Sequence, residues 1–222
     1  MSSTDSPIRR RRKEARPQEL LDAALELFVE KGFAATRADE VATRAGVSKG
    51  TLYLYYPSKE DLLKAVIAQH LSERIAAGAE QAAQFTGTPG ELLRSILVQW
   101  WTHVYESDAS AVFKLVITEV RNFPEIAEFY TREVVEPGKQ LTGRILARGI
   151  ARGEFRKIDI PGAVMSLIFP MVMLCLHKHS LGACVPGVAD VDPHAFVRQH
   201  IALVLNGLLV EPEAKPVRRG RA

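Results

Sequence analysis

Residues 36–59, with the sequence TRADEVATRAGVSKGTLYLYYPSK, constrain the fold of this chain more than any other stretch. In the first half, small apolar residues recur at the spacing of one helix face, at Ala38, Val41, Ala42 and Ala45. Thr36 is a candidate N-cap for that helix, and Gly46 tolerates the positive φ with which helices often end. Ser48 can cap a second short helix that Pro57 closes. Two short helices joined by a tight, glycine-containing turn indicate a helix-turn-helix, which is a nucleic-acid-binding motif.

The composition is typical of a soluble globular protein, because 47% of the residues are hydrophobic and 25% are charged. No run of about 18 apolar residues is present, so we expect no membrane span. The N-terminus is basic but no apolar signal core follows it, which predicts a cytoplasmic protein. Two cysteines, Cys175 and Cys184, are too few for a disulfide framework. No Gly-rich phosphate loop is visible, and we expect no cofactor.

Helical periodicity with clear breaks predicts an all-α protein of about nine helices. The expected helices cover residues 17–31, 38–45, 49–56, 59–84, 91–106, 108–122, 124–152, 161–181 and 192–209. Pro137-Gly138 is expected to kink or split the seventh of these helices. The fourth helix would span about 39 Å and leave the N-terminal domain, which makes it a mechanical link to a second domain.

We therefore divide the chain into a disordered basic arm (1–15), a helix-turn-helix DNA-binding domain (16–60), a helical ligand-binding and dimerisation domain (61–210) and a disordered tail (211–222). Residues 8–16, IRRRRKEAR, hold six basic residues and one acidic residue, a local net charge of +5. This arm is expected to track DNA phosphates or enter a minor groove, with a solubilising terminus as the alternative.

The ending KGF of the first helix, followed by ATRADEVATRAGVSKGTLYLYYPSKEDLL, resembles the TetR family of bacterial transcriptional repressors over residues 16–66. RNFPEIAEFY followed by ARGEF is similar to the ligand domain of one subgroup. The resemblance implies a dimer, in which each subunit has a three-helix DNA-binding domain and a helical ligand domain. Leu54 and Tyr56 stand where family members often carry Tyr or His and Phe, so no operator sequence is carried over.

The residues expected to contact DNA lie in and around the second helix of the motif, which should enter the major groove. Its outward side chains can meet base edges and phosphates, and the residues at the helix starts suit phosphate contacts. For the tyrosines the alternative is packing within the domain. The predicted DNA contacts are Thr36, Arg37, Ser48, Lys49, Gly50, Thr51, Tyr53, Leu54, Tyr55 and Lys59.

The second domain is expected to hold a small-molecule effector in a mostly apolar cavity with a few polar anchors. The alternative for most of its aromatic residues is ordinary core packing. The candidates are Trp100, His103, Tyr105, Phe113, Glu119, Phe123, Phe169 and Met173. Residues 175–179, CLHKH, do not predict a metal site, because His177 and His179 point apart on a helix and lack a second ligand pair.

The last two expected helices, 161–181 and 192–209, are predicted to form a homodimer through a four-helix interface. The first carries a stripe at Leu167, Met171, Leu174 and His177 or Lys178, and the second one at Phe196, His200, Leu203, Val204 and Gly207.

These features predict a ligand-responsive repressor that binds a palindromic operator as a dimer and is released by a small apolar or aromatic effector. A DNA-binding regulator that responds to a protein partner, or to no ligand, is the alternative. An enzyme is not expected, because no nucleophile–base pair or metal-site motif is visible.

Overall fold

The computed structural model of the protein describes residues 7–185 and 192–210. These residues are helical apart from short connections, and their only β-type pairing is an isolated bridge between Phe155 and Leu209. The elements are α1 (Pro7–Lys31), α2 (Ala38–Arg44), α3 (Lys49–Tyr55), α4 (Lys59–Ile67), η1 (Ala68–Ser72), α5 (Glu73–Gln84), α6 (Pro89–Glu106), α7 (Ala109–Glu119), α8 (Pro124–Tyr130), η2 (Thr131–Val135), α9 (Glu136–Ala151), α10 (Ile160–Lys178), α11 (Leu181–Cys184) and α12 (Pro193–Leu208). The expected all-α class is confirmed.

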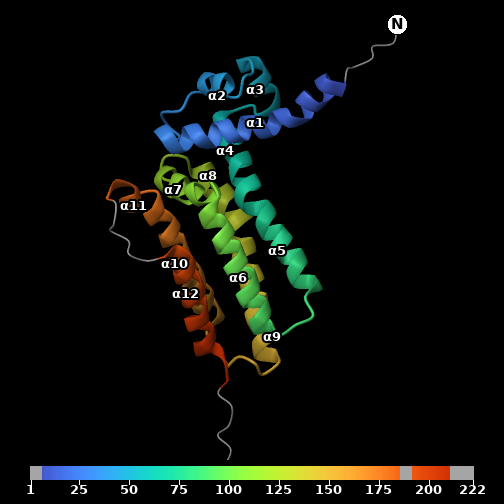
Figure 1. The fold of residues 1–222 in the computed structure, drawn as a ribbon, viewed down its shortest axis with the longest axis vertical. Helices are drawn as coiled ribbons and strands as arrows, with labels where there is room; N and C mark the ends of the chain where they lie inside the picture. The colour runs from blue at the N-terminus through green and yellow to red at the C-terminus, as the bar shows by residue number, and fades with distance from the viewer. Residues whose placement is uncertain (1–6, 186–191, 211–222) are drawn as a thin grey trace, which may run out of the picture.

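Helices α1, α2 and α3 form a small domain at one end of the molecule, with α1 lying across the end of the longer helices (Figure 1). Apolar side chains from all three helices fill its interior, and Leu20, Phe28, Val41 and Leu52 are almost completely inaccessible to solvent. Phe33, which follows α1, is also fully buried. The three-helix arrangement expected for the helix-turn-helix domain is therefore present.

Helix α1 begins at Pro7, whereas the sequence analysis places its start near Pro17 and residues 1–15 in a disordered arm. The expectation of disorder is wrong for residues 7–15. They are rich in Arg, Lys, Glu and Ala, which favour helix, and Pro17 removes only one backbone donor from the long helix. Residues 1–6 and the expected tail at 211–222 lie outside the described residues.

Residues 59–84 are helical throughout, as predicted, but the helix is interrupted by the π-helical segment η1 between α4 and α5. A second π-helical segment, η2, lies between α8 and α9, just before Pro137, where a break was expected. Because proline has no N–H, the preceding turn cannot complete its α-helical hydrogen bonds, and a wider turn is one way to accommodate it. The backbone N–H of Glu136 instead bonds to the carbonyl of Thr131. The two π-helical segments pack against each other.

The second domain is built around α6, which contacts α7, α9 and α12. Helix α10 packs against α7, α9 and α12, and burial of Val164, Leu167, Met171 and Cys175 defines its inner face. The helical segment from Ile160 to Cys184 has a window with a mean hydropathy of 1.9, so its length and composition alone would suit a membrane span. The apolar residues of α10 lie on two faces of the helix, one packed in the domain and one exposed.

Candidate nucleic-acid interface and apolar cavity

The turn between α2 and α3 has the geometry that the motif requires. Gly46 adopts a φ of +66°, and the N–H of Val47 bonds to the carbonyl of Ala42 at 2.9 Å. The hydroxyl of Ser48 accepts a hydrogen bond from the N–H of Thr51 at 3.1 Å and so caps α3, as predicted. This turn sets the direction in which α3 leaves α2.

The outward face of α3 consists of Lys49, Gly50, Tyr53 and Leu54, all of which are exposed. Residues four apart lie on one helix face, and the amino group of Lys49 is 5.9 Å from the centre of the Tyr53 ring. Leu54 is 84% exposed and Tyr53 is 41% exposed. The face thus combines a cation, a phenol, an aliphatic side chain and bare backbone, which suits both phosphates and base edges.

Thr51 and Tyr55 lie closer to the body of the domain than the residues of that outward face. The hydroxyl of Thr51 is 2.9 Å from that of Ser48, and both side chains share the start of α3. Tyr55 is half-buried and packs against the hydrophobic core. Packing, the alternative considered for the tyrosines, therefore applies to Tyr55 more than to Tyr53.

Thr36 and Lys59 stabilise the loop between α1 and α2. Thr36 is buried, and its hydroxyl lies 3.1 Å from the carbonyl oxygen of Leu27 and 2.8 Å from that of Gly32. The amino group of Lys59 donates to the carbonyls of Phe33, Ala34 and Thr36 at 2.8, 3.1 and 3.1 Å. The phosphate-contact role expected for these two residues is corrected on this ground, because their donors already bind backbone oxygens. Arg37, rather than Thr36, precedes the first residue of α2.

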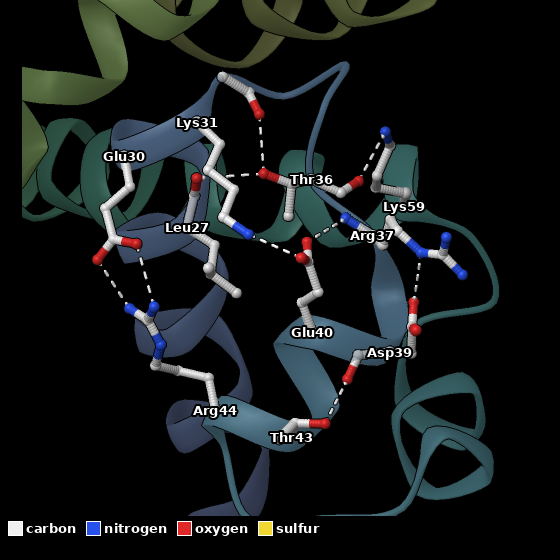
Figure 2. Close-up of polar contacts among 11 residues, drawn as sticks. Leu27, Glu30, Lys31, Thr36, Arg37, Asp39, Glu40, Thr43, Arg44 and Lys59 are labelled. Atoms are coloured by element: carbon white, nitrogen blue, oxygen red, sulfur yellow. Dashed lines mark hydrogen bonds and ion pairs between the residues drawn. The ribbon is translucent and has the colours of Figure 1, made fainter.

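Ion pairs fix α2 against the end of α1 (Figure 2). The guanidinium of Arg44 contacts Glu30 at 2.8 Å and Glu26 at 3.1 Å, and it lowers the pKa of the Glu30 carboxyl. Lys31 reaches Glu40 at 2.7 Å. These pairs are exposed, so salt screens them, and their main effect is on orientation.

Arg37 lies at the start of α2 and remains largely exposed, as a phosphate contact requires. Its guanidinium Nε is 3.1 Å from Asp39, and this hydrogen bond lowers the pKa of the Asp39 carboxyl. The backbone N–H of Arg37 donates to Glu40 at 3.1 Å, which closes the first turn of the helix.

A cavity of about 260 Å³ lies in the second domain between α5, α6, α7, α9 and α10. Of the eight predicted effector residues, the structure brings Trp100, Phe113 and Phe169 to its wall. Phe113 is buried, whereas Phe169 is 62% exposed, so the cavity reaches the surface beside α10. The walls are almost entirely apolar, in keeping with the expected character of the site.

The other five predicted effector residues lie elsewhere. His103 is exposed on α6, and Met173 is exposed on α10 one turn beyond Phe169. The ring of Tyr105 lies under the amino group of Lys178, at 4.7 Å from its centre. The buried Glu119 lies near Gly32, and Phe123 packs against Phe33, both where the two domains meet. Adjacent residues of a helix point in different directions, so these five side chains do not line the cavity, although other residues of α6, α7 and α10 do.

The sequence analysis missed the part of the cavity wall that α5, the end of α8, η2 and α9 contribute. A Cβ added at Gly78 would lie 3.5 Å from Leu141, and one at Gly138 would lie 3.8 Å from Ile75, so α5 and α9 cross closely. Glycines facing each other across two amphipathic stretches were the available signal. The missed wall residues include Ile75, Gly78, Tyr130, Val134, Leu141 and Thr142.

Polar groups at the cavity are few and mostly donors. The Nε of Arg74 and the indole N–H of Trp100 are buried, and neither has a hydrogen-bond partner among the described residues. Lys139 lies at the same wall, with its amino group 2.8 Å from Glu136. Burial raises the pKa of Tyr130, so its phenol stays neutral. Arg74 and Trp100 both line the cavity, so a small movement of either side chain would bring an unpaired donor to a bound acceptor or anionic group.

Helices α10 and α12 lie side by side on one flank of the second domain (Figure 1). The interface stripe predicted for the first of these helices is wrong at Leu167 and Met171, because both are buried in the core. The exposed apolar residues there are Phe169 and Met173, and Leu203 on α12 is 72% exposed. The apolar surface that α10 exposes therefore differs from the predicted stripe at Leu167 and Met171.

Within the described residues, no group of three or more His, Cys, Asp or Glu side chains is arranged to hold a metal ion. Cys175 is buried and Cys184 is exposed, and both are free thiols. Burial raises the pKa of the Cys175 thiol to about 12.

Two protein-family models match the chain. The model of bacterial regulatory proteins of the tetR family matches residues 20–66, which include α2 and α3. The model of the tetracyclin repressor-like C-terminal domain matches residues 83–180, which include most of the cavity wall.

Individual relatives agree with these matches. The HTH-type transcriptional activator FasR of Mycolicibacterium smegmatis is 32% identical over 52% of this chain, which spans about half (52%) of that relative's length. The HTH-type transcriptional repressor KstR2 of Rhodococcus jostii is 28% identical over 88% of this chain and 92% of its own. A solved structure of the transcriptional regulator FadR from Bacillus subtilis, in complex with stearoyl-CoA, has a TM-score of 0.66 at 20% identity, covering 86% of this chain and 98% of that one.

Proposed function

The chain belongs to the TetR family of DNA-binding transcriptional regulators, and from that membership we propose that it is a ligand-responsive repressor. In this proposal it binds a palindromic operator as a homodimer, and a small apolar effector releases it. The observation that carries the proposal is one helical segment, Lys59–Gln84, that starts beside the helix-turn-helix and lines the cavity with Arg74, Ile75 and Gly78.

The DNA contacts proposed here are the exposed residues of α3 and the residues at the starts of α2 and α3. Lys49 and Tyr53 reach phosphate or base edges, Gly50 lets the backbone approach closely, and Arg37 and Ser48 face phosphates. In a two-fold symmetric dimer, two such helices about 34–36 Å apart match half-sites one helical turn apart.

The homodimer is proposed to form through the outer faces of α10 and α12. Phe169, Met173 and Leu203 are large apolar side chains exposed on this flank, and a second copy would remove them from water. Two helices from each subunit give a four-helix interface. We also place the protein in the cytoplasm, where an operator is accessible.

The effector is proposed to be an amphiphile with an apolar body and an anionic or hydrogen-bond-accepting head. The apolar walls suit the body, and the unused donors of Arg74 and Trp100, with Lys139 nearby, suit the head. The relatives support this chemistry by analogy, since the Bacillus subtilis FadR structure contains stearoyl-CoA.

Effector binding is proposed to reach the DNA-binding domain through the paired π-helical segments. Val134 of η2 lines the cavity, and η2 packs against η1. The segment η1 directly follows α4 in the same continuous helix. π-Helical turns within α-helices are frequent at functional sites. An effector that fits one arrangement of this pair better than the other shifts the orientation of α4, and with it the spacing of the two α3 helices.

The test begins with duplexes selected by the purified protein from a random-sequence pool. We expect salt-dependent binding of one palindromic class of duplex, and release when stearate or stearoyl-CoA is added. Stearyl alcohol serves as the matched neutral probe, and Arg74→Gln should weaken release by stearate more than release by the alcohol. Unchanged DNA affinity with every probe, together with no shift in melting temperature, would refute the effector part.

A further inference from the structure

Leu54 is 84% exposed, more than any other large apolar side chain in residues 16–185 and 192–210. It lies on α3, away from the flank of α10 and α12 that holds Phe169, Met173 and Leu203. Its outward position is fixed by the helix, because Leu52, two residues earlier, is fully buried and anchors the opposite face. The fold of the domain therefore gains nothing from an aliphatic residue at position 54.

The surface beside Leu54 allows close approach. Gly50 lies one turn earlier on the same face, and side chains on a helix lean toward its N-terminus, which directs Leu54 toward Gly50. A Cβ added at Gly50 would have only the Ser48 hydroxyl within 4 Å, at 3.8 Å, among the described residues. Lys49 and Tyr53 lie beside this glycine notch, so an apolar tip is flanked by a cation and a phenol.

Leucine has no hydrogen-bond donor, so it cannot bind a phosphate oxygen or the donor and acceptor groups of base edges. The apolar group that the major groove of ordinary DNA offers is the C5-methyl of thymine. We infer that Leu54 reads the C5-methyl of one thymine in each half-site of the operator. The inference rests on the proposed binding of α3 in the major groove, and it adds the base that this position selects.

The test uses the full-length protein and a duplex selected by it from a random-sequence pool. Each thymine of one half-site is replaced singly by deoxyuridine, which removes only the methyl group. Wild-type affinity should fall about fourfold at one position, as expected for one buried methyl group, and little at the others. In Leu54→Ala the same replacement should have no effect, while the variant stays folded because the side chain is exposed.

Two controls separate Leu54 from its neighbours. Thr51 also carries a methyl group, so Thr51→Ser should keep the deoxyuridine penalty at the position assigned to Leu54. At that position, a cytosine–guanine pair should bind the wild type weakly, and 5-methylcytosine should recover part of the affinity, because its methyl group occupies the same place in the groove. The Leu54→Ala variant should bind the duplexes with cytosine and with 5-methylcytosine equally tightly.

Three results would overturn the inference. One is a duplex that binds tightly but shows no thymine sensitive to deoxyuridine. Another is a deoxyuridine penalty that persists in Leu54→Ala. The third is an equal loss of affinity by Leu54→Ala for selected and unrelated duplexes, which would indicate contact with the backbone or with another protein. Failure to select any duplex would instead contradict the proposed function itself.

Discussion

The ring of Phe33 stands edge-on to that of Phe123, with the ring centres 4.8 Å apart and the planes at 90°. Phe33 follows α1 in the DNA-binding domain, and Phe123 precedes α8 in the second domain. Phe33 also contacts Phe28 edge-on at 5.2 Å, and the amino group of Lys59 lies 4.5 Å from its centre. One aromatic residue thus joins the core of the small domain, the start of α4 and the neighbouring domain.

A double-mutant cycle should measure this junction. We expect Phe33→Leu and Phe123→Leu each to lower the free energy of unfolding, and the double variant to lose less than the sum by about 0.5–1.5 kcal/mol. The reason is that edge-to-face aromatic pairs add energy beyond buried area. Chemical denaturation of the four proteins gives the coupling energy. Strict additivity would show that the two rings do not stabilise each other.

Lys59 and Lys49 should behave oppositely when replaced by methionine, which keeps an unbranched side chain of similar length and removes the charge. Lys59→Met removes the amino group that donates to three backbone carbonyls, so the free energy of unfolding should fall by about 1–3 kcal/mol. Lys49→Met should change stability by less than about 0.5 kcal/mol. It should weaken DNA binding and make the salt dependence shallower by about one unit. Equal stabilities for the two variants would contradict the role given to Lys59.

Acid should destabilise the protein through two partly buried histidines, His70 and His179. Burial lowers the pKa of His70 from its usual 6.5 despite Asp22 and Asp108 nearby, and Arg74 lowers it further. The same direction holds for His179, where burial adds to Lys178 and Lys114. Below the ordinary pKa the unfolded chain therefore binds more protons than the folded one, and stability falls as the pH falls through this region.

The measurement is the urea midpoint at a series of pH values from neutral to mildly acidic. His70→Gln removes one of the two groups, so its stability should fall less steeply than that of the wild type as the pH drops. An identical pH dependence in both proteins would exclude His70 as a contributor.

Helix positions could be predicted from the sequence because their signals are local. Ser48 and Asp192 cap the helices that follow them, and Gly46 and Gly153 have the positive φ expected where a helix ends. The π-helical turns could not be predicted in the same way. They depend on how α4–α5 and α8–α9 cross, which is a property of the packed domain.

The outward face of α3 was predictable because the short helix has one buried residue, Leu52, that sets its orientation. The cavity could not be predicted, because an apolar residue in a core and one in a cavity wall look alike in the sequence. Phe113 and Phe123 illustrate this, since the first lines the cavity and the second packs between domains. Only the rotation of each helix about its axis separates the two cases.

Two glycines of α9 provide a last, matched test of the packing. The chain turns back after Gly153, and the ring of Phe155 packs directly on Gly149, where an added Cβ would collide with it. Gly149→Ala should therefore lower the free energy of unfolding by about 1–3 kcal/mol through overpacking. At Gly143 an added Cβ would meet Ile160 at 3.6 Å, an ordinary contact. Gly143→Ala should raise stability by up to about 1 kcal/mol, because alanine favours helix. Thermal unfolding of both variants measures these changes. Stabilisation of both would mean that helix propensity alone controls the effect and that Phe155 does not pack against Gly149 as described.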